Sequence, residues 1–290
     1  MSVNNSRATR WGMPIMAASS VLFSAMSLLI PLTRSVNTSL VASARFVTGI
    51  VVILGLALAG FTRIKPVNRW WLIVRGLIGA TSVYFFYRGI TMLGLGKGTV
   101  LNYTYPVFAA LLAPLMLKEK LSWDVVAAVL VSFVGIALVV NPGRLNAIGV
   151  EELLALLGGV LSGIAVVAIK KLRETDTSYV IYLAQCVFGL LVVGWPTITS
   201  SFGFSGQIWL ILLGVGILAT AAQLAMTWAY KHVPATEGSL LGFLVPVLNV
   251  LLGVLVFGET MRVSTVAGSA LVLICCGYVA FRERILRLVG

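Results

Sequence analysis

Charged residues are scarce in this sequence: only 10% of its 290 residues are Asp, Glu, Lys or Arg, whereas a soluble domain carries about 25%. Hydrophobic residues make up 59% of the chain, and its mean hydropathy is +1.04. This balance excludes a soluble globular protein and predicts a chain whose solvent is the lipid bilayer. Strand-like alternation is also missing, and the apolar runs are far longer than the roughly ten residues of a membrane strand. We therefore expect membrane-spanning helices.

Acidic residues and histidine are rarer still. The nine acids all lie in connections or near the ends of apolar runs, and His232 is the only histidine. The three cysteines, Cys186, Cys275 and Cys276, lie in apolar runs without a pairing or metal-binding spacing. These absences argue against a membrane-embedded enzyme and against a metal or other cofactor. They also remove the buried carboxylate and histidine relays of proton-coupled carriers, which favours facilitated exchange, uniport or coupling through groups at helix ends.

The apolar runs are long enough for ten membrane crossings. A helix needs about 20 apolar residues to span a hydrocarbon core of about 30 Å. The connections between the runs are short, so the function must lie within the helix bundle. The predicted spans cover residues 12–30, 38–60, 71–92, 98–117, 122–140, 152–169, 178–195, 207–229, 236–257 and 263–281. We predict an all-α membrane protein of ten transmembrane helices.

The two halves of the chain repeat each other at a nearly constant offset in sequence. The matched pairs are Pro106 and Pro246, Glu119 and Glu259, Arg34 and Arg173, Ser39 and Ser178, and Gly49 and Gly189. Each half holds five spans, an odd number, so the second half enters the membrane from the opposite side. Two inverted five-helix repeats, residues 11–141 and 149–282, predict a carrier that opens a central site to each side of the membrane in turn.

Basic residues are distributed unevenly between the connections. If the N-terminus is cytoplasmic, 14 lysines and arginines lie on the cytoplasmic side and 4 on the other. This bias places both termini in the cytoplasm, as expected for a bacterial-type inner membrane protein. The net charge of +12 is therefore a signal of topology and of contact with lipid headgroups, and we expect no nucleic-acid partner.

Spans four and nine share a motif. Each has a proline near its middle, Pro106 or Pro246, and a glutamate at its end, Glu119 or Glu259. The doubled motif resembles the EamA pattern of the drug/metabolite transporter superfamily, and within it the chain most resembles the YddG-type aromatic amino-acid exporters. The resemblance implies a ten-helix exporter of amino acids or other small metabolites. A drug or nucleotide-sugar carrier of the same superfamily is the alternative, and the oligomeric state stays open.

The paired prolines are candidate hinges. A proline inside a helix leaves the carbonyl four residues earlier without its amide partner, here at Asn102 and Gly242. In a membrane such carbonyls need partners within the protein or in a wet cavity. A matched pair of interrupted helices indicates a transport site, whereas the alternative is that both prolines only bend their helices for packing.

Polar residues within the spans are candidate substrate ligands, because such side chains face protein or water rather than lipid. The alternatives are hydrogen bonds between helices and, for Tyr84, an aromatic belt at the interface. The tyrosines suit an amino acid with an apolar side chain. The predicted substrate-binding residues are Ser24, Tyr84, Asn102, Tyr105, Ser162, Gln223, Thr227 and Asn249.

Three arginines lie within spans. Arg75 is close enough to a span end for its side chain to reach the cytoplasm, so we expect a structural role. Arg88, near the other end of the same span, can reach outward or meet a substrate carboxylate. Arg45 matches the neutral Gln185 in the repeat, and the sequence does not decide whether it caps carbonyls or faces a water path.

Overall fold

The computed structural model describes residues 3–105, 149–232, 242 and 244–289, together with Phe108 and isolated positions between 123 and 138. Every regular element in this part of the chain is a helix. Pro106, Glu119 and most of the fourth and fifth predicted spans lie outside the described residues.

The helices follow the predicted spans closely. Helices α2, α3, α7, α8 and α9 begin and end within three residues of the expected bounds. The first half contains α1 (Val3–Leu29), η1 (Ile30–Thr33), α2 (Thr38–Leu58), α3 (Arg69–Leu93) and α4 (Leu95–Asn102). The second half contains α7 (Val150–Leu172), α8 (Ser178–Ile198), α9 (Gly206–Ala229), α11 (Leu244–Phe257) and α12 (Val263–Val289). Of the helices described, α1, α2, α7, α8 and α9 are each long and apolar enough to cross a membrane.

Equivalent residues start the second helix of each half. The Asn37 side chain accepts a hydrogen bond from the Ser39 amide at 2.9 Å and caps α2. The Thr177 hydroxyl accepts one from the Val180 amide and caps α8. Both side chains satisfy an amide that the first turn of a helix leaves unpaired. The offset that relates the two prolines of the repeat also relates these two caps, so the repeat extends to local structure.

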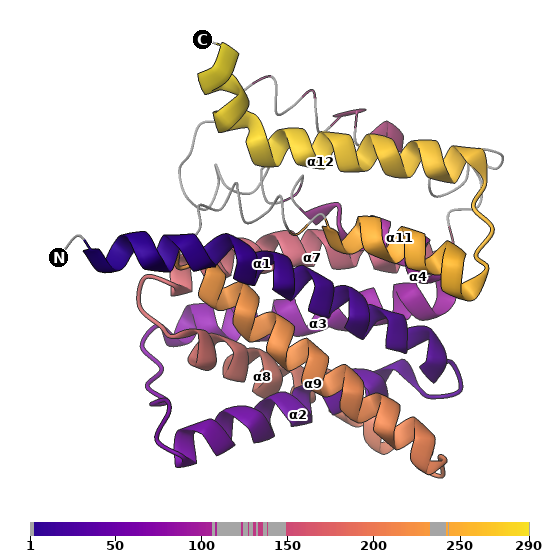
Figure 1. Ribbon diagram of the computed structural model, residues 1–290. Coiled ribbons are helices and arrows are strands. Elements are labelled where there is room, and N and C mark those ends of the chain that lie inside the picture. Colours follow the sequence, from indigo (N-terminus) through magenta and orange to yellow (C-terminus); the bar gives the residue numbers. More distant parts are fainter. Residues whose placement is uncertain are drawn as a thin grey trace.

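The helices of the two halves interleave (Figure 1). Helix α3 packs against α7 and α8, while α1 and α2 pack against α9. Exchanging the halves turns the pair α1–α9 into α7–α3 and the pair α2–α9 into α8–α3. The pair α2–α8 joins a helix to its own repeat partner, and further contacts between the halves join α4 to α7 and α11 and join α1 to α11. The packing therefore has approximate two-fold symmetry.

The crossing of α2 and α8 shows that the halves are inverted. A Cβ atom on Gly49 would lie 2.6 Å from Cys186 Sγ, and one on Gly189 would lie 2.6 Å from the Phe46 ring. The two contacts are reciprocal, because the repeat matches Phe46 with Cys186 just as it matches the two glycines. Gly49 follows Phe46 along α2, whereas its contact Cys186 precedes Gly189 along α8. The two helices therefore run antiparallel. The prediction of an all-helical fold built from two inverted repeats is confirmed.

This crossing gives a direct test of the packing. Gly189→Ala places a methyl group against the fully buried Phe46 ring, and such overpacking costs about 1–3 kcal/mol. Gly194→Ala on the same helix is the control, since a Cβ there meets nothing within 4 Å and alanine favours a helix. Chemical unfolding in mixed micelles should show a loss of stability for the first variant alone. Equal stability of both variants would contradict the close crossing.

Candidate functional site

A cavity lies between the two halves of the bundle. It leaves about 130 Å³ for the centres of water molecules, which is room for on the order of ten waters or a solute the size of an amino acid. Both halves contribute to its wall. The lining residues are Met16, Ser19, Ser20, Phe23, Arg45, Arg75, Gly79, Ser82, Val83, Phe86, Asn102, Tyr103, Tyr105, Ser162, Ala165, Val166, Ile169, Gln185, Gln223, Met226, Tyr230, Gly242 and Val245.

Two arginines of the first half reach this cavity, and each is held by a glutamine of the second half. Arg45 on α2 donates from Nη2 to Gln223 Oε1 at 3.2 Å and from Nη1 to the Tyr87 hydroxyl at 3.2 Å. Arg75 on α3 donates from Nη2 to Gln185 Oε1 at 2.9 Å. Because the glutamine partners are neutral, both positive charges remain uncompensated by these bonds.

Several donors at the cavity have no partner among the described residues. They are Nε of Arg45, Nε and Nη1 of Arg75, and Nδ2 of Asn102. All three side chains are at most 5% exposed. A buried donor without a partner costs about 1–3 kcal/mol, so these groups are suited to a ligand that accepts hydrogen bonds.

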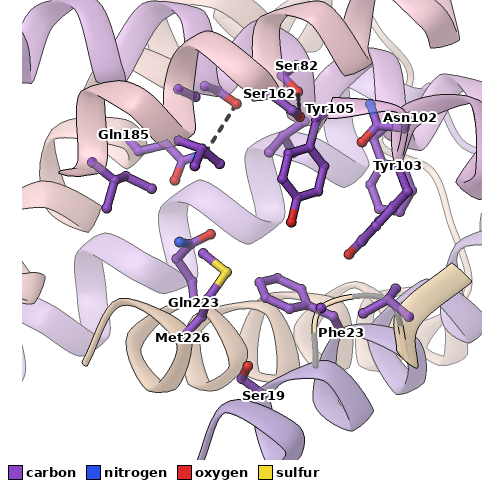
Figure 2. Close-up of a pocket in the computed structure, with 18 of the residues that line it drawn as sticks. Ser19, Phe23, Ser82, Asn102, Tyr103, Tyr105, Ser162, Gln185, Gln223 and Met226 are labelled. Carbon is purple, nitrogen blue, oxygen red and sulfur yellow. Dashed lines mark hydrogen bonds between the residues drawn. The ribbon is translucent and has the colours of Figure 1, made fainter. Parts of the chain in front are cut away.

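An aromatic wall faces the polar groups. Tyr103 stands edge-on to both Phe86 and Tyr105, with ring centroids 6.2 and 5.7 Å apart. Figure 2 shows Tyr103 and Tyr105 pointing into the cavity, with Phe23 of α1 across from them. Such rings bind apolar groups through their faces and edges. The cavity therefore combines hydrogen-bond donors with an apolar surface.

The end of α4 brings polar groups to the cavity. The helix stops at Asn102, the residue whose carbonyl the proline pattern marks as unpaired, and Tyr103 caps it. The small residue Gly159 of α7 lets this break approach closely, since a Cβ there would lie 3.0 Å from the Asn102 carbonyl oxygen. An early end to α4 is thus what turns Asn102, Tyr103 and Tyr105 toward the cavity.

The predicted ligands divide into two groups. Asn102, Tyr105, Ser162 and Gln223 line the cavity, with Ser162 bonded to Ser82 at 2.5 Å (Figure 2). The other four residues are not part of its lining. Ser24 bonds the Val245 carbonyl, Tyr84 packs on Phe85, Thr227 bonds Gln223, and Asn249 donates to Thr99. Ser24 and Thr227 thus support neighbours that do line the cavity.

The candidate hinges are only partly described. Pro106 lies outside the described residues. Pro246 is buried in the first turn of α11, and Gly242, four residues earlier, lines the cavity. The hinge role of both prolines stays a prediction.

The arginines differ from expectation. Arg75 does not reach the cytoplasm: it is 4% exposed and bonded to Gln185, because Gly79 one turn later leaves space for its guanidinium. Arg45 faces the cavity, which decides the question the sequence left open. Arg88 instead pairs with Glu151 of α7.

Contacts between the halves tie one end of the bundle. Arg88 makes two bonds to the Glu151 carboxylate at 2.8 and 2.6 Å, and Lys97 pairs with Glu152 at 2.8 Å. Glu259, after α11, accepts the Leu95 and Gly96 amides at 2.5 and 3.1 Å and so caps α4. The cavity lining lies toward the opposite end, where α7 and α9 finish.

The histidine near the end of α9 adds no charge close to the cavity. His232 follows α9 and stacks against Trp228, with ring centroids 4.3 Å apart. Burial lowers its pKa, and the nearby charges of Lys231 and Arg173 lower it further. The imidazole is therefore neutral at pH 7.

Comparison with known proteins points to membrane transport. The sequence model of the EamA-like transporter family matches residues 10–141 and 150–281. The pseudopaline exporter CntI of Pseudomonas aeruginosa is 27% identical over 208 residues, which are 71% of this chain and 72% of that protein. The human solute carrier family 35 member G1 is 27% identical over 237 residues, 73% of this chain and 63% of its own. A solved crystal structure shares the fold, with a TM-score of 0.65 at 21% identity, over 95% of this chain and 98% of the other.

Proposed function

The chain belongs to the EamA-like transporter family, and from this premise we propose that it exports small metabolites, amino acids foremost, by alternating access through the cavity between its halves. It is an integral, multi-pass membrane protein. The narrower resemblance to YddG-type aromatic amino-acid exporters stays a prediction, because the relatives described above do not test it.

The observation that carries the proposal is the position of the cavity. Its wall comes from α1, α2, α3 and α4 of one half and from α7, α8, α9 and α11 of the other. The two halves are inverted copies, so each can take the arrangement of the other. Such an exchange opens a site between them first to one side of the membrane and then to the other.

The contacts at the ends of the bundle support loading from the cytoplasm. The ion pairs Arg88–Glu151 and Lys97–Glu152 hold the end at which α7 begins. The bias of basic residues predicts that this end lies outside and that both termini lie in the cytoplasm. In this orientation the cavity lies toward the cytoplasmic side, which is the side from which an exporter takes its substrate.

The chemistry of the cavity supports an amino-acid-like substrate. The unpartnered donors of Arg45, Arg75 and Asn102 suit a carboxylate, and the aromatic wall suits an apolar side chain. CntI is named as an exporter of pseudopaline, and export is also the direction proposed for this chain. The residues proposed to contact the substrate are Asn102, Tyr105, Ser162 and Gln223.

Counterflow in proteoliposomes tests this function. Vesicles preloaded with each amino acid in turn should accumulate the same labelled amino acid, for at least one of them. Ser162→Trp fills the cavity and should abolish this uptake. Leu157→Trp is the matched control on α7, because residue 157 is 43% exposed on the outer surface of the bundle, and it should leave uptake intact. Absence of counterflow with every amino acid would contradict amino-acid export.

A further inference from the structure

We propose that Arg45 and Arg75 form an anion subsite, which makes the cavity selective for organic substrates that carry more carboxylate than ammonium groups. This proposal rests on the proposed function, because it names the substrate class of the same cavity. It goes further in ranking solutes of one shape by their net charge.

The first argument is the burial of two like charges. Arg45 and Arg75 are 2% and 4% exposed, and both line one cavity inside the helix bundle. No Asp or Glu belongs to the lining among the residues described, and neither arginine takes part in the ion pairs recorded there. An ionisable residue inside a membrane is costly and needs a partner. An anionic substrate supplies the missing negative charge.

The second argument is the way the guanidinium groups are oriented. The Gln185 side chain donates from Nε2 to the Gly79 carbonyl at 3.2 Å, so its oxygen is turned toward Arg75. Gln223 donates to Thr227, so its oxygen is turned toward Arg45. Arg75 thus has one nitrogen fixed by Gln185 and keeps Nε and Nη1 free. Arg45 has both terminal nitrogens bonded to neutral acceptors and keeps Nε free. Charged N–H donors without partners form strong hydrogen bonds to a carboxylate.

The third argument concerns the rest of the substrate. An amino acid brings an ammonium group together with its carboxylate, and the described lining offers no carboxylate to receive it. The ammonium would instead lie in a cavity that already holds two positive charges. An apolar body, by contrast, has the rings of Phe23, Phe86 and Tyr103 to pack on. Among solutes with the same apolar or aromatic body, the cavity should therefore bind the one with the largest excess of carboxylate over ammonium groups most tightly.

Gly79 is a positioning residue for this subsite. A Cβ on Gly79 would overlap Nη1 of Arg75. Gly79→Ala therefore displaces the guanidinium while its charge remains in the protein. Gly79→Ala moves the Arg75 charge, whereas Arg75→Gln removes it. Comparing the two variants shows whether the position of the charge matters for binding.

Three ligands with the same aromatic body test the ranking. At pH 6 phenylpyruvate carries one negative charge, phenylalanine is neutral overall, and phenylalaninamide is positive. Equilibrium binding to the full-length protein in phosphatidylcholine vesicles, which add no net charge, should be about tenfold tighter at each step toward the anion. Equal affinity for the three ligands in the unaltered protein would overturn the proposal, whatever the variants do. Tighter binding of phenyl phosphate than of phenylpyruvate would overturn the assignment to carboxylates.

Variants locate the subsite. Arg45→Gln and Arg75→Gln should each weaken phenylpyruvate binding about tenfold while affecting phenylalaninamide little, and Gly79→Ala should resemble Arg75→Gln. Arg63→Gln removes the same charge from the exposed connection between α2 and α3 and should change nothing. An unchanged ligand ranking in a folded Arg75→Gln protein would overturn the proposal. If amino acids show counterflow but the three ligands bind without any preference for charge, only the anion subsite is contradicted. If the ligands bind in the expected order but no solute shows counterflow, only the transport function is contradicted.

Discussion

Replacing Glu259 with alanine should lower the free energy of unfolding by about 2–4 kcal/mol, because two buried amides lose their acceptor. The first turn of a helix leaves its leading amides without partners inside the helix. In α4 these are the amides of Leu95 and Gly96, and both bond the Glu259 carboxylate. The negative charge also lies at the positive end of the helix dipole. Gly94, at φ +93°, has no Cβ to block the carboxylate.

Two further glutamate variants make this test specific. Glu259→Gln keeps one acceptor oxygen but turns an amide group toward the second donor, so it should cost about half as much. Glu174→Ala removes a glutamate that is 63% exposed and pairs with a lysine that is itself 44% exposed, so we expect a loss under about 0.5 kcal/mol. Chemical unfolding in mixed micelles measures all three. A Glu259→Ala protein as stable as Glu174→Ala would show that Glu259 does not cap α4.

Neutralising Glu151 and Glu152 together should open the end of the bundle that they tie. Their ion pairs join α7 to α3 and α4 of the other half, and the four side chains are 15% to 32% exposed. After allowance for solvent screening, we expect the two pairs to contribute about 1–2 kcal/mol to the closed arrangement. Their loss corresponds to a shift of about 5- to 30-fold in the ratio of open to closed protein.

Thiol labelling measures this shift. Val166→Cys places a reporter on the cavity wall, in a protein whose three natural cysteines are replaced by alanine. Glu151→Gln with Glu152→Gln should raise its rate of reaction with an impermeant maleimide added from the side on which Glu151 lies. Exchanging the charges, Arg88→Glu with Glu151→Arg, should restore the slow rate if Glu152 is kept. A slow rate in the neutralised protein, or no recovery after the exchange, would mean that these pairs do not hold the bundle closed.

Among the features of the sequence, the repeat predicted most about the fold. Its nearly constant offset matched Gly49 with Gly189, and these residues meet the opposite helix reciprocally at the crossing of α2 and α8. The proline pattern marked Asn102, and α4 ends at that residue. A repeat can be recognised from sequence alone, because finding it requires only a comparison of residues along the chain and not their contacts in space.

The site was only partly predictable, because spacing defines a helix face to within a residue or two. Successive helix positions differ by about 100°, so Val83 faces the cavity while the neighbouring Tyr84 packs on Phe85. Polar character alone does not separate a substrate-binding residue from one that joins two helices. Asn249, for example, is fully buried and bonds Thr99 of α4. Asn102 was easier to identify because a backbone constraint, rather than polarity alone, marked it.

Tertiary partners explain what the sequence could not indicate. Arg75 lies between one and two turns into α3, a distance compatible with reaching the cytoplasm, but Gln185 of the other half holds it in the core. The sequence marked Glu259 only as the glutamate at the end of the span-nine motif, yet it caps α4, which lies in the other half of the chain. Both partners are distant in sequence and neither matches its residue through the repeat. Such contacts follow only from the way the halves interlock.

The reciprocal crossing of α2 and α8 also bears on how the chain arose. A contact in which Gly49 meets Cys186 while Gly189 meets Phe46 is an isologous interface, the kind that joins two identical subunits. In an ancestral homodimer of one five-helix unit, every substitution at this interface would have acted twice. In a single chain the two copies can differ. Arg45 and Gln185 occupy equivalent positions beside the crossing, so one copy carries a charge that a symmetric dimer would carry in both.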